Sequence, residues 1–189
     1  MNASTIAADG ALALQEIGLS PNARVLDVGT GKGNFAIYLA SQGYRVTTGE
    51  PNTDTTIYAN RPWRENARKA GVLDRIQFQS FDAHRLPFPD RSFDAVFFFG
   101  VLHHIDEAVR PKVFREALRV TKEDGAVVFF EPRHAMLEKI WVDDPTHPLA
   151  ADPSLYLPDN APQEKGIEGI LMDVFIYRMA EALISTPSR

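Results

Sequence analysis

The sequence contains no cysteine among its 189 residues. Disulfide bonds, a catalytic thiolate and a cysteine-bound zinc ion are therefore excluded, because the side chain they require is missing. Long apolar runs are lacking too, since no stretch approaches the roughly 18 residues of a membrane-spanning helix. The first residues also show no basic segment followed by an apolar one, the pattern of a secretory signal. These absences lead us to expect a cytoplasmic protein without a membrane span.

An excess of positive charge is also missing. The chain carries 20 basic and 25 acidic residues, which gives a formal net charge of −5, so its charge does not favour binding along nucleic-acid phosphates. Hydrophobic residues make up 44% and charged residues 24% of the chain, as is typical of a folded globular protein. A chain of this length fits one domain, so we expect residues 1–189 to form a single unit.

Short apolar segments alternate with helix-like segments along most of the chain. Strands are expected near residues 24–28, 44–48, 76–79, 93–99 and 126–130, and helices near residues 5–18, 35–40, 53–70 and 107–120. Apolar strands separated by helices are typical of a mostly parallel sheet covered on both faces. The expected fold class is therefore α/β, a Rossmann-like three-layer sandwich. Ligands bind such sheets outside the carboxyl ends of the strands.

A glycine-rich segment follows the first expected strand. It contains Gly29, Gly31 and Gly33, and glycines let the backbone turn sharply and approach a ligand. A dinucleotide site has two residues before the last glycine, whereas here that gap is one residue and Asp27 precedes the first glycine. A carboxylate at this place repels a pyrophosphate but suits a cationic ligand, such as a sulfonium-bearing amino acid.

Two further carboxylates follow the next expected strands. Glu50 can accept hydrogen bonds from both hydroxyls of a ribose. Asp82 can accept one from the amino group of an adenine, while the backbone N–H of the following residue donates to a ring nitrogen. The glycines alone would also fit a structural turn, and a ribose site suits nicotinamide and methionine nucleosides alike. Three carboxylates at successive strand ends favour a ligand-binding edge over unrelated surface residues.

The segments that carry these residues resemble the class I S-adenosylmethionine-dependent methyltransferases over residues 20–132, in particular the small-molecule enzymes of ubiquinone and menaquinone biosynthesis. The matching segments are Val25–Gly33, Phe81–Phe88, Ser92–Val96, Val101–Ile105 and Gly125–Pro132. The resemblance implies S-adenosylmethionine as cofactor, with Asp27 and the glycine loop at its methionine part and Glu50 at its ribose. It further implies Asp82 and Ala83 at the adenine, and Gly100 and Val101 beside the transferred methyl group.

Methyl transfer is an in-line displacement at an already activated carbon, so the protein chiefly aligns the reactants and no metal is expected. A general base helps when the acceptor is a hydroxyl or an acidic carbon. His104 is the candidate for that role, ahead of His103 and His134, although each also fits a capping or packing role. Two features favour a small-molecule acceptor over nucleic acid. Acidic residues outnumber basic ones, and no Asn/Asp-Pro-Pro-aromatic signature follows the fourth expected strand.

The pattern changes after Pro132. Residues 133–189 are expected to cover the acceptor side of a donor-binding core formed by residues 20–132, and the strands that usually close the sheet are expected to be reduced or atypical. The spacing of Ile167, Ile170, Leu171 and Val174 predicts a helix at about 167–184, although residues 173–179 also fit a strand. The apolar face of that helix needs a partner, so a homodimer is expected.

Two other classes of function stay open. One is a non-catalytic module that binds S-adenosylmethionine to regulate a partner, because no residue in the sequence is assuredly catalytic. The other is a nicotinamide-dependent oxidoreductase, against which the single-residue gap before Gly33 and the carboxylate of Asp27 both count.

Overall fold

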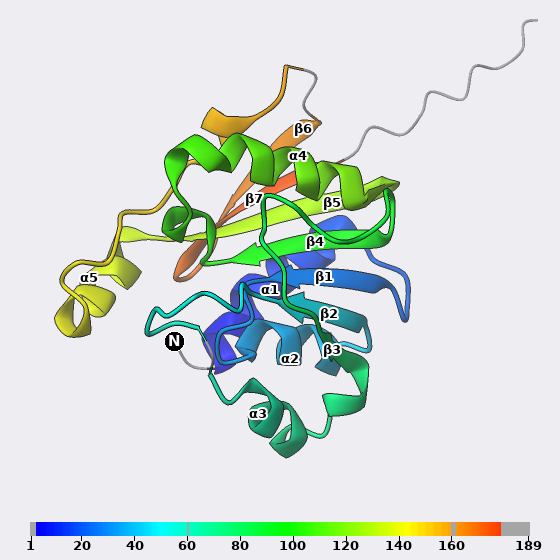
Figure 1. The fold of residues 1–189 in the computed structure, drawn as a ribbon, viewed down its shortest axis with the longest axis horizontal. Helices are drawn as coiled ribbons and strands as arrows, with labels where there is room; N and C mark the ends of the chain where they lie inside the picture. Colours follow the sequence, from blue (N-terminus) through cyan, green and yellow to red (C-terminus); the bar gives the residue numbers. More distant parts are fainter. Residues whose placement is uncertain (1–2, 60, 160–161, 179–189) are drawn as a thin grey trace, which may run out of the picture.

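The computed structural model describes residues 3–59, 61–159 and 162–178. Within these residues seven strands form one sheet in the order β3-β2-β1-β4-β5-β7-β6 (Figure 1). The strands are β1 Arg24–Val28, β2 Arg45–Gly49, β3 Ile76–Phe78, β4 Phe93–Phe99, β5 Thr121–Pro132, β6 Gln163–Glu168 and β7 Met172–Arg178. The α-helices are α1 Ala3–Ile17, α2 Asn34–Ser41, α3 Trp63–Lys69, α4 Arg110–Val120 and α5 His134–Asp143, and the 3₁₀ turns are η1 Leu73–Arg75, η2 Leu102–His104, η3 Glu107–Val109 and η4 Pro153–Tyr156.

The strands β1 to β5 are mutually parallel. The chain moves outward from β1 to β2 and β3, then returns to the other side of β1 to form β4 and β5. The direction of strand order thus reverses between β1 and β4. Ligands bind open α/β sheets at such a reversal, outside the carboxyl ends of the strands. The expected α/β fold is confirmed, and its topology places the binding edge beside the ends of β1 and β4.

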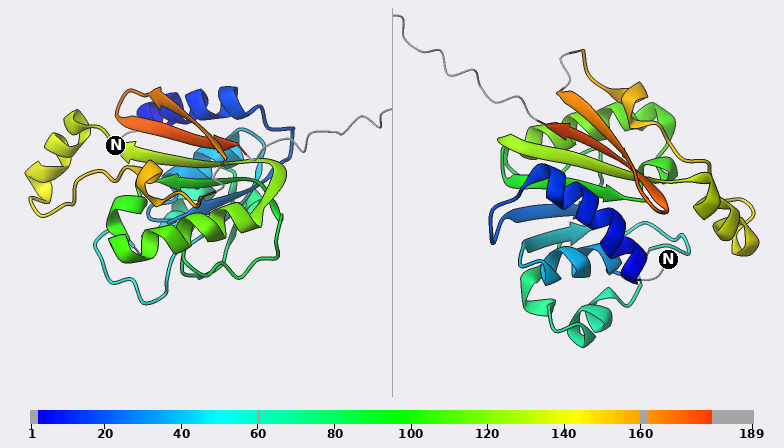
Figure 2. Two further views of the ribbon diagram at one scale, coloured as in Figure 1. Left: turned by 90° about the horizontal axis from the view of Figure 1, so that it is seen from above. Right: turned by 180° about the vertical axis from the view of Figure 1, so that it is seen from behind.

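Helices cover both faces of the sheet, because alternate side chains of a buried strand point to opposite faces. On β4, Phe97 packs in a cluster with residues of α1, α2 and α3, whereas the adjacent Phe98 packs in a cluster with residues of α4. Figure 2 shows α1 and α4 on opposite sides of the sheet. On α4 the buried residues Val113, Phe114, Ala117 and Val120 recur at helical spacing, which explains why one stripe of this helix faces the sheet.

The prediction of a helix at about 167–184 is wrong for residues 167–178, which the structure describes. Residues 163–168 and 172–178 form an antiparallel hairpin, in which β7 lies between β5 and β6. Residues 179–184 lie outside the described residues. The buried side chains of Met172, Val174 and Ile176 alternate with less buried ones, as expected of a strand. The closing strands are therefore not reduced, contrary to the expectation from the sequence.

The turn of this hairpin is held by a buried carboxylate on α1. Asp9 is fully buried, and its two oxygens accept hydrogen bonds from the backbone N–H groups of Ile170 (2.6 Å), Leu171 (3.2 Å) and Met172 (3.2 Å). Charge-assisted bonds of this kind are the stronger ones in proteins. Ile167 and Val174 already pack within the sheet, so these side chains do not need a second subunit to cover them. The homodimer stays a prediction, but the packing of these two residues no longer supports it.

The predicted helix at 53–70 is shorter than expected. Only Trp63–Lys69 is helical, and Pro62 stands at the N-cap, because a proline fits the first turn of a helix but not its interior. Residues 50–59 instead form a loop that reaches the binding edge. Helix α5, which directly follows β5, lies at the same edge (Figure 1). The chain after Pro132 therefore divides into a part at the binding edge and a hairpin that completes the sheet.

Candidate active site

The loop after β1 turns through backbone conformations that favour glycine. Gly29 has φ +89° and Gly31 has φ +47°, a region that other residues rarely adopt. A Cβ atom on Gly29 would lie 2.5 Å from Cγ2 of Val101, which follows β4. The N–H of Gly29 donates to the carbonyl of Gly49 at 2.8 Å, so the loop is fastened to the end of β2.

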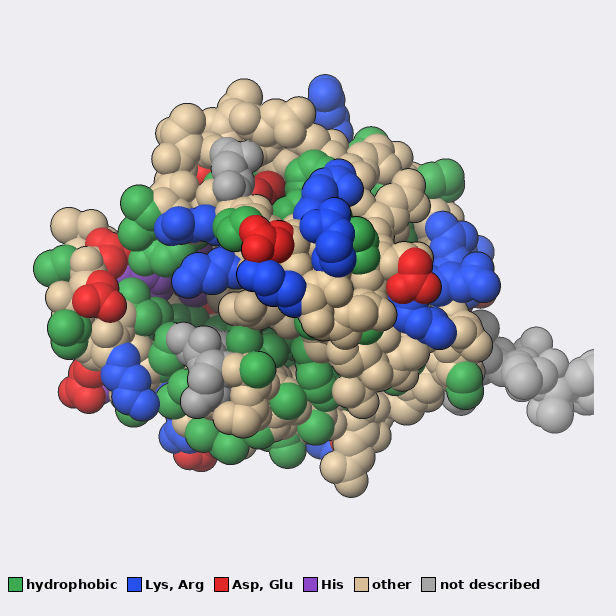
Figure 3. Space-filling model, turned by 90° about the horizontal axis from the view of Figure 1, so that it is seen from below, with side chains coloured by type: hydrophobic (Ala, Val, Ile, Leu, Met, Phe, Trp, Pro, Cys, Tyr) green, Lys and Arg blue, Asp and Glu red, His purple; other side chains and the backbone are tan. Residues whose placement is uncertain are grey.

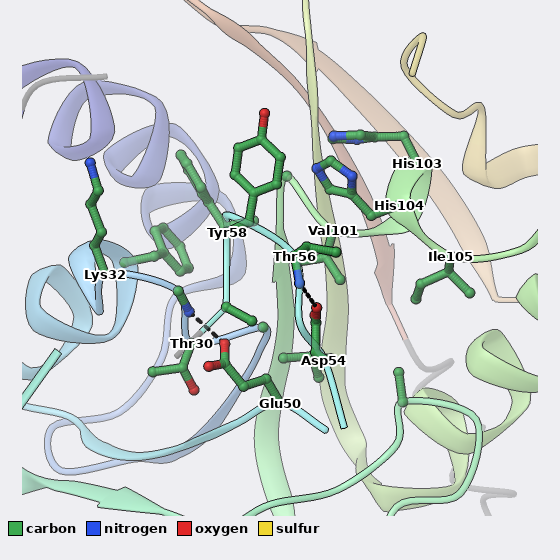
Figure 4. A pocket seen from close by; sticks show the side chains of 18 of the residues that line it. Thr30, Lys32, Glu50, Asp54, Thr56, Tyr58, Val101, His103, His104 and Ile105 are labelled. Carbon is green, nitrogen blue, oxygen red and sulfur yellow. Dashed lines mark hydrogen bonds between the residues drawn. The ribbon is translucent and has the colours of Figure 1, made fainter. Parts of the chain in front are cut away.

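Glu50 connects the second strand to the same loop. Its Oε2 atom accepts a hydrogen bond from the N–H of Gly31 at 2.9 Å (Figure 4), and the side chain is largely buried. A carboxylate is thereby held at the end of β2, facing the glycine loop at the end of β1. The two strand ends predicted from the sequence to share a ligand thus lie side by side.

Asp27 lies behind the glycine loop. Its side chain is buried, Oδ2 accepts a hydrogen bond from the Thr48 hydroxyl at 2.9 Å, and Thr48 in turn contacts the Thr30 hydroxyl at 3.0 Å. Oδ1 has no partner. Burial raises the pKa of Asp27 to about 7, and the nearby charge of Glu50 acts in the same direction. The hydrogen bond from Thr48 opposes this shift. A cation bound nearby would favour the ionised form.

A cavity of about 590 Å³ opens at this edge, within the usual range for small-molecule sites. Histidine side chains are visible inside a hollow on the face drawn in Figure 3. Most of the residues predicted from the sequence line the cavity, namely Gly29, Gly31, Glu50, Asp82, Ala83, Gly100, Val101, His103 and His104. Asp27 and Gly33 are not among its lining residues: Asp27 supports the loop from behind, and a Cβ atom on Gly33 would meet that of Trp63 at 2.9 Å.

His103 is paired with a carboxylate inside the protein. The Nδ1 atom of His103 lies 2.7 Å from Oε2 of Glu131, and both side chains are about 2% exposed. The N–H of Ala151 also donates to Oε2 of Glu131 at 2.9 Å, whereas Oε1 of Glu131 has no partner. The pair fixes the ring of His103 in one orientation at the wall of the cavity. Glu131, near the end of β5, holds this histidine.

His104 lies on the more exposed side of the same wall. Its ring is 5.0 Å from that of Tyr58, and the Tyr58 hydroxyl donates to Asp144 at 2.6 Å. Figure 4 shows the ring of His104 beside that of Tyr58. Partial desolvation at the cavity wall, together with repulsion between protonated His104 and the protonated forms of His103 and His147, lowers the pKa of His104 to about 4. The imidazole of His104 is therefore neutral at pH 7.

A third histidine, His147, completes this end of the cavity. Its ring centroid lies 5.0 Å from that of His103 and 4.8 Å from that of His104. Nothing in the local sequence indicated this, because the segment after α5 has no periodicity and its position depends on tertiary contacts. His134, in contrast, is exposed on α5, where it contacts Glu138 and Trp141, and it is not a lining residue.

The cavity is suited to a cationic nucleoside such as S-adenosylmethionine. The unpartnered Oδ1 of Asp27 provides buried negative charge behind the glycine loop, and Gly31 contributes no side chain to the space in front of it. Glu50 and Asp82 provide carboxylates at two further strand ends. Gly29, Gly31 and Glu50 are the residues that would hold the methionine and ribose parts, and Asp82 with Ala83 would hold the adenine.

Comparisons with known proteins agree with this description. The model of the methyltransferase-domain family matches residues 26–129. The 27-O-demethylrifamycin SV methyltransferase of Amycolatopsis mediterranei is 37% identical over 102 residues, which cover 54% of this chain and 36% of that protein. The ubiquinone/menaquinone biosynthesis C-methyltransferase UbiE of Citrifermentans bemidjiense is 37% identical over 122 residues, 63% of this chain and 49% of that protein. The chain thus spans between about a third and a half of the length of these two relatives.

A solved structure extends the likeness of the fold beyond the matched segment. The SAM-dependent methyltransferase of Aquifex aeolicus superposes with a TM-score of 0.66 at 19% identity, covering 95% of this chain and all of that one. None of the helices in the described ranges is long and apolar enough to cross a membrane. From the family match and the shared fold we conclude that this chain belongs to the methyltransferase-domain family and has the fold of S-adenosylmethionine-dependent methyltransferases.

Proposed function

We propose that this chain transfers the methyl group of S-adenosylmethionine to a nucleophilic oxygen, nitrogen or carbon of a small-molecule acceptor. One observation carries the proposal: a single cavity is bordered by the glycine loop, by Glu50 and Asp82, and at its other end by histidines. The first part suits a nucleoside with a cationic amino-acid tail, and the second suits an acceptor whose proton must be removed.

The donor contacts follow from the order of these residues along the cavity. Gly29 and Gly31 adjoin the methionine part, with the charge of Asp27 acting through the loop. The carboxylate of Glu50 accepts hydrogen bonds from the ribose hydroxyls. The hydrogen bond that it accepts from the N–H of Gly31 is then either kept alongside them or replaced by them. Asp82 accepts from the adenine amino group while the N–H of Ala83 donates to the ring. Gly100 and Val101 border the methyl group.

The bound donor supplies a methyl group on a positively charged sulfur, which an acceptor displaces in line. The protein contributes alignment and the exclusion of water. Tyr58, Met136 and Ile140 line the cavity from the loop after β2 and from α5, so the acceptor would be enclosed by residues on both sides of Pro132. This arrangement supports the expectation that part of the segment after Pro132 covers the acceptor.

Two observations support His103 rather than His104 as the base for an acceptor that needs one. A base works best when its pKa lies near the working pH, and the pKa of His104 is lowered to about 4. His103 has a carboxylate behind its ring, at 2.7 Å, which orients the imidazole as a base requires. His104 then serves as a neutral wall of the acceptor site.

A small-molecule acceptor is supported by the relatives. The two curated relatives are named for 27-O-demethylrifamycin SV and for ubiquinone and menaquinone biosynthesis. They match this chain over 102 and 122 residues, but each is at least twice as long as the shared part. The acceptor of this chain is therefore proposed by class and not by name.

Calorimetry with S-adenosylmethionine and S-adenosylhomocysteine tests the donor site. Gly31→Val should abolish binding, because its side chain would project where only the carbonyl of Tyr58 lies close, at 3.4 Å. Gly71→Val is the matched control, since Gly71 also has a positive φ but no atom within 4 Å of the added Cβ. It should share the backbone strain and still bind the donor.

The outcomes separate the three classes of function. Binding of a nicotinamide dinucleotide, without binding of either methionine nucleoside, would overturn the donor assignment. Donor binding with no methylated product among the metabolites of a cell extract, followed by mass spectrometry, would reduce the chain to a donor-binding module. The proposal requires both donor binding and a metabolite heavier by one methylene group.

A further inference from the structure

Three imidazoles meet at the acceptor end of the cavity. One ring nitrogen from each of His103, His104 and His147 lies within 4.8 Å of the other two. His103 and His104 come from η2, directly after β4, while His147 follows α5. Three protein ligands that converge from two separate segments, beside a cavity, form the arrangement of an open metal site. Cysteine is absent from the chain, so a soft thiolate site is not an option.

Hydrogen bonds to the other ring nitrogen support this interpretation. The Nδ1 atom of His103 lies 2.7 Å from Glu131, and that of His147 lies 2.9 Å from the carbonyl of Pro148. When Nδ1 donates to an oxygen, Nε2 presents a lone pair. Histidines that bind metals almost always donate their other N–H to a carboxylate or a backbone carbonyl, and both kinds of acceptor are present here.

The buried carboxylate of Glu131, behind the ring of His103, is an independent reason to expect a cation at the three histidines. Glu131 is 2% exposed, and its Oε1 atom has no hydrogen-bond partner. A buried carboxylate is costly unless a positive charge or further hydrogen bonds compensate it. The nearest group able to carry positive charge is the ring of His103. A cation on the far side of that ring would supply the compensation through the His103–Glu131 bond.

His147 is positioned by its own segment and not by the other histidines. Its N–H donates to the carbonyl of Asp144 at 3.1 Å, and its carbonyl accepts from the indole N–H of Trp141 at 2.9 Å. The side chain of Asp144 in turn accepts from Tyr58. These contacts place the backbone at residue 147 through bonds that replacing the imidazole would leave intact.

We propose that His103, His104 and His147 bind one divalent transition-metal ion of the zinc type through their Nε2 atoms, with Glu131 and the Pro148 carbonyl as supporting acceptors. Imidazole suits zinc, nickel, copper and iron ions. Zinc–nitrogen bonds of about 2.0–2.1 Å in a tetrahedron place the nitrogens about 3.4 Å apart. The ring nitrogens here lie within 4.8 Å of one another, so binding requires them to approach by no more than about 1.4 Å.

The fourth position of the ion faces the cavity, because all three histidines line it. An oxygen of the acceptor can bind there, and the imidazoles are then ligands instead of proton acceptors. This last point rests on the proposed methyl transfer, whereas metal binding does not. The sequence alone predicted no metal, since the transfer chemistry does not require one and His147 could not be placed beside the other two.

Metal binding is measured with Zn²⁺ by calorimetry and with Co²⁺ by visible absorption, on protein without a polyhistidine tag and without the methyl donor. The parent should bind one ion per chain, and Co²⁺ should give the strong visible bands of a four-coordinate site. Glu131→Gln should weaken zinc binding about 10–100-fold, as loss of a supporting acceptor does. His147→Ala should weaken it at least as much.

His134→Ala is the matched control, because His134 is exposed on α5 and does not line the cavity. It should bind zinc like the parent. His104→Ala removes a more exposed ring and provides a second ligand test if circular dichroism shows that His147→Ala fails to fold. The proposal is overturned if the parent binds no zinc, if the ligand variant that folds binds it as tightly as the parent, or if His134→Ala weakens binding equally. Donor binding, measured separately, reports on the proposed function alone.

Discussion

Replacing Asp27 by asparagine should change how the stability of the protein depends on pH. The carboxyl group is 1% exposed and has one hydrogen-bond partner, the Thr48 hydroxyl, at Oδ2. Burial, partly offset by that bond and reinforced by the charge of Glu50, raises its pKa from 3.8 to about 7. Because one pKa unit corresponds to about 1.4 kcal/mol, the ionised form costs the folded protein about 4 kcal/mol.

The sign follows from proton binding in the two states. Between pH 3.8 and about 7 the folded protein keeps the proton of Asp27 while the unfolded chain has lost it, so the free energy of unfolding falls as pH rises. The contribution is fully present below the unfolded pKa and is lost as pH passes the folded one. Between about pH 5 and pH 8.5 this one group should remove about 3 kcal/mol from the parent.

Urea unfolding of the parent and of Asp27→Asn at several pH values measures the effect. The amide still accepts from Thr48, but its NH₂ group lacks a partner beside the orphaned Oδ1 position, at a cost of about 1–3 kcal/mol. The parent should therefore be the more stable protein near pH 5 and the variant near pH 8.5. Asp124→Asn, at an exposed position on β5, should follow the parent. Parallel curves for the parent and Asp27→Asn would refute the reasoning.

Four other changes test the remaining parts of the structure. Glu50→Ala should weaken donor binding at least tenfold by calorimetry, because a hydrogen bond to a charged group contributes about 1.5–3 kcal/mol; unchanged affinity would move the ribose site elsewhere. Once an acceptor is known, and with protein freed of metal by a chelator, His103→Gln should lower kcat with donor affinity unchanged while His104→Gln has a small effect, and the reverse order would reinstate His104 as the base. Truncation after Pro132 should yield protein that does not fold, seen as loss of a cooperative thermal transition, because β7 pairs along most of β5.

The donor side of the site could be predicted from the sequence because its parts are local. The turn around Gly29 and Gly31 is encoded by residue types with special backbone freedom, and Glu50 and Asp82 each follow a recognisable strand. In a parallel sheet the carboxyl ends of the strands share one edge, so these residues had to come together. Residue spacing and the rules of sheet topology were sufficient for this part.

The closing hairpin could not be predicted, because two periodicities overlap in it. Ile167, Ile170, Leu171 and Val174 follow the spacing of a helical face, yet Met172, Val174 and Ile176 also alternate as a strand requires. The choice was made by contacts distant in sequence, namely pairing with β5 and the carboxylate of Asp9 on α1. The position of His147 has a similar origin, since tertiary contacts alone bring it to His103.

The place of β7 inside the sheet also affects how the protein can fold while it is being made. Strand β5 leaves the ribosome with one edge unpaired until Met172–Arg178 has been synthesised, because its partner on that side is β7. An unpaired edge of apolar strand residues is prone to join other chains. The donor-binding half can form its local turns early, but the sheet on which it rests is completed by β7, whose neighbours in the sheet are β5 and β6. Folding of the sheet should therefore wait until residue 178 has been made, and nascent chains that end before residue 172 should depend most on chaperones.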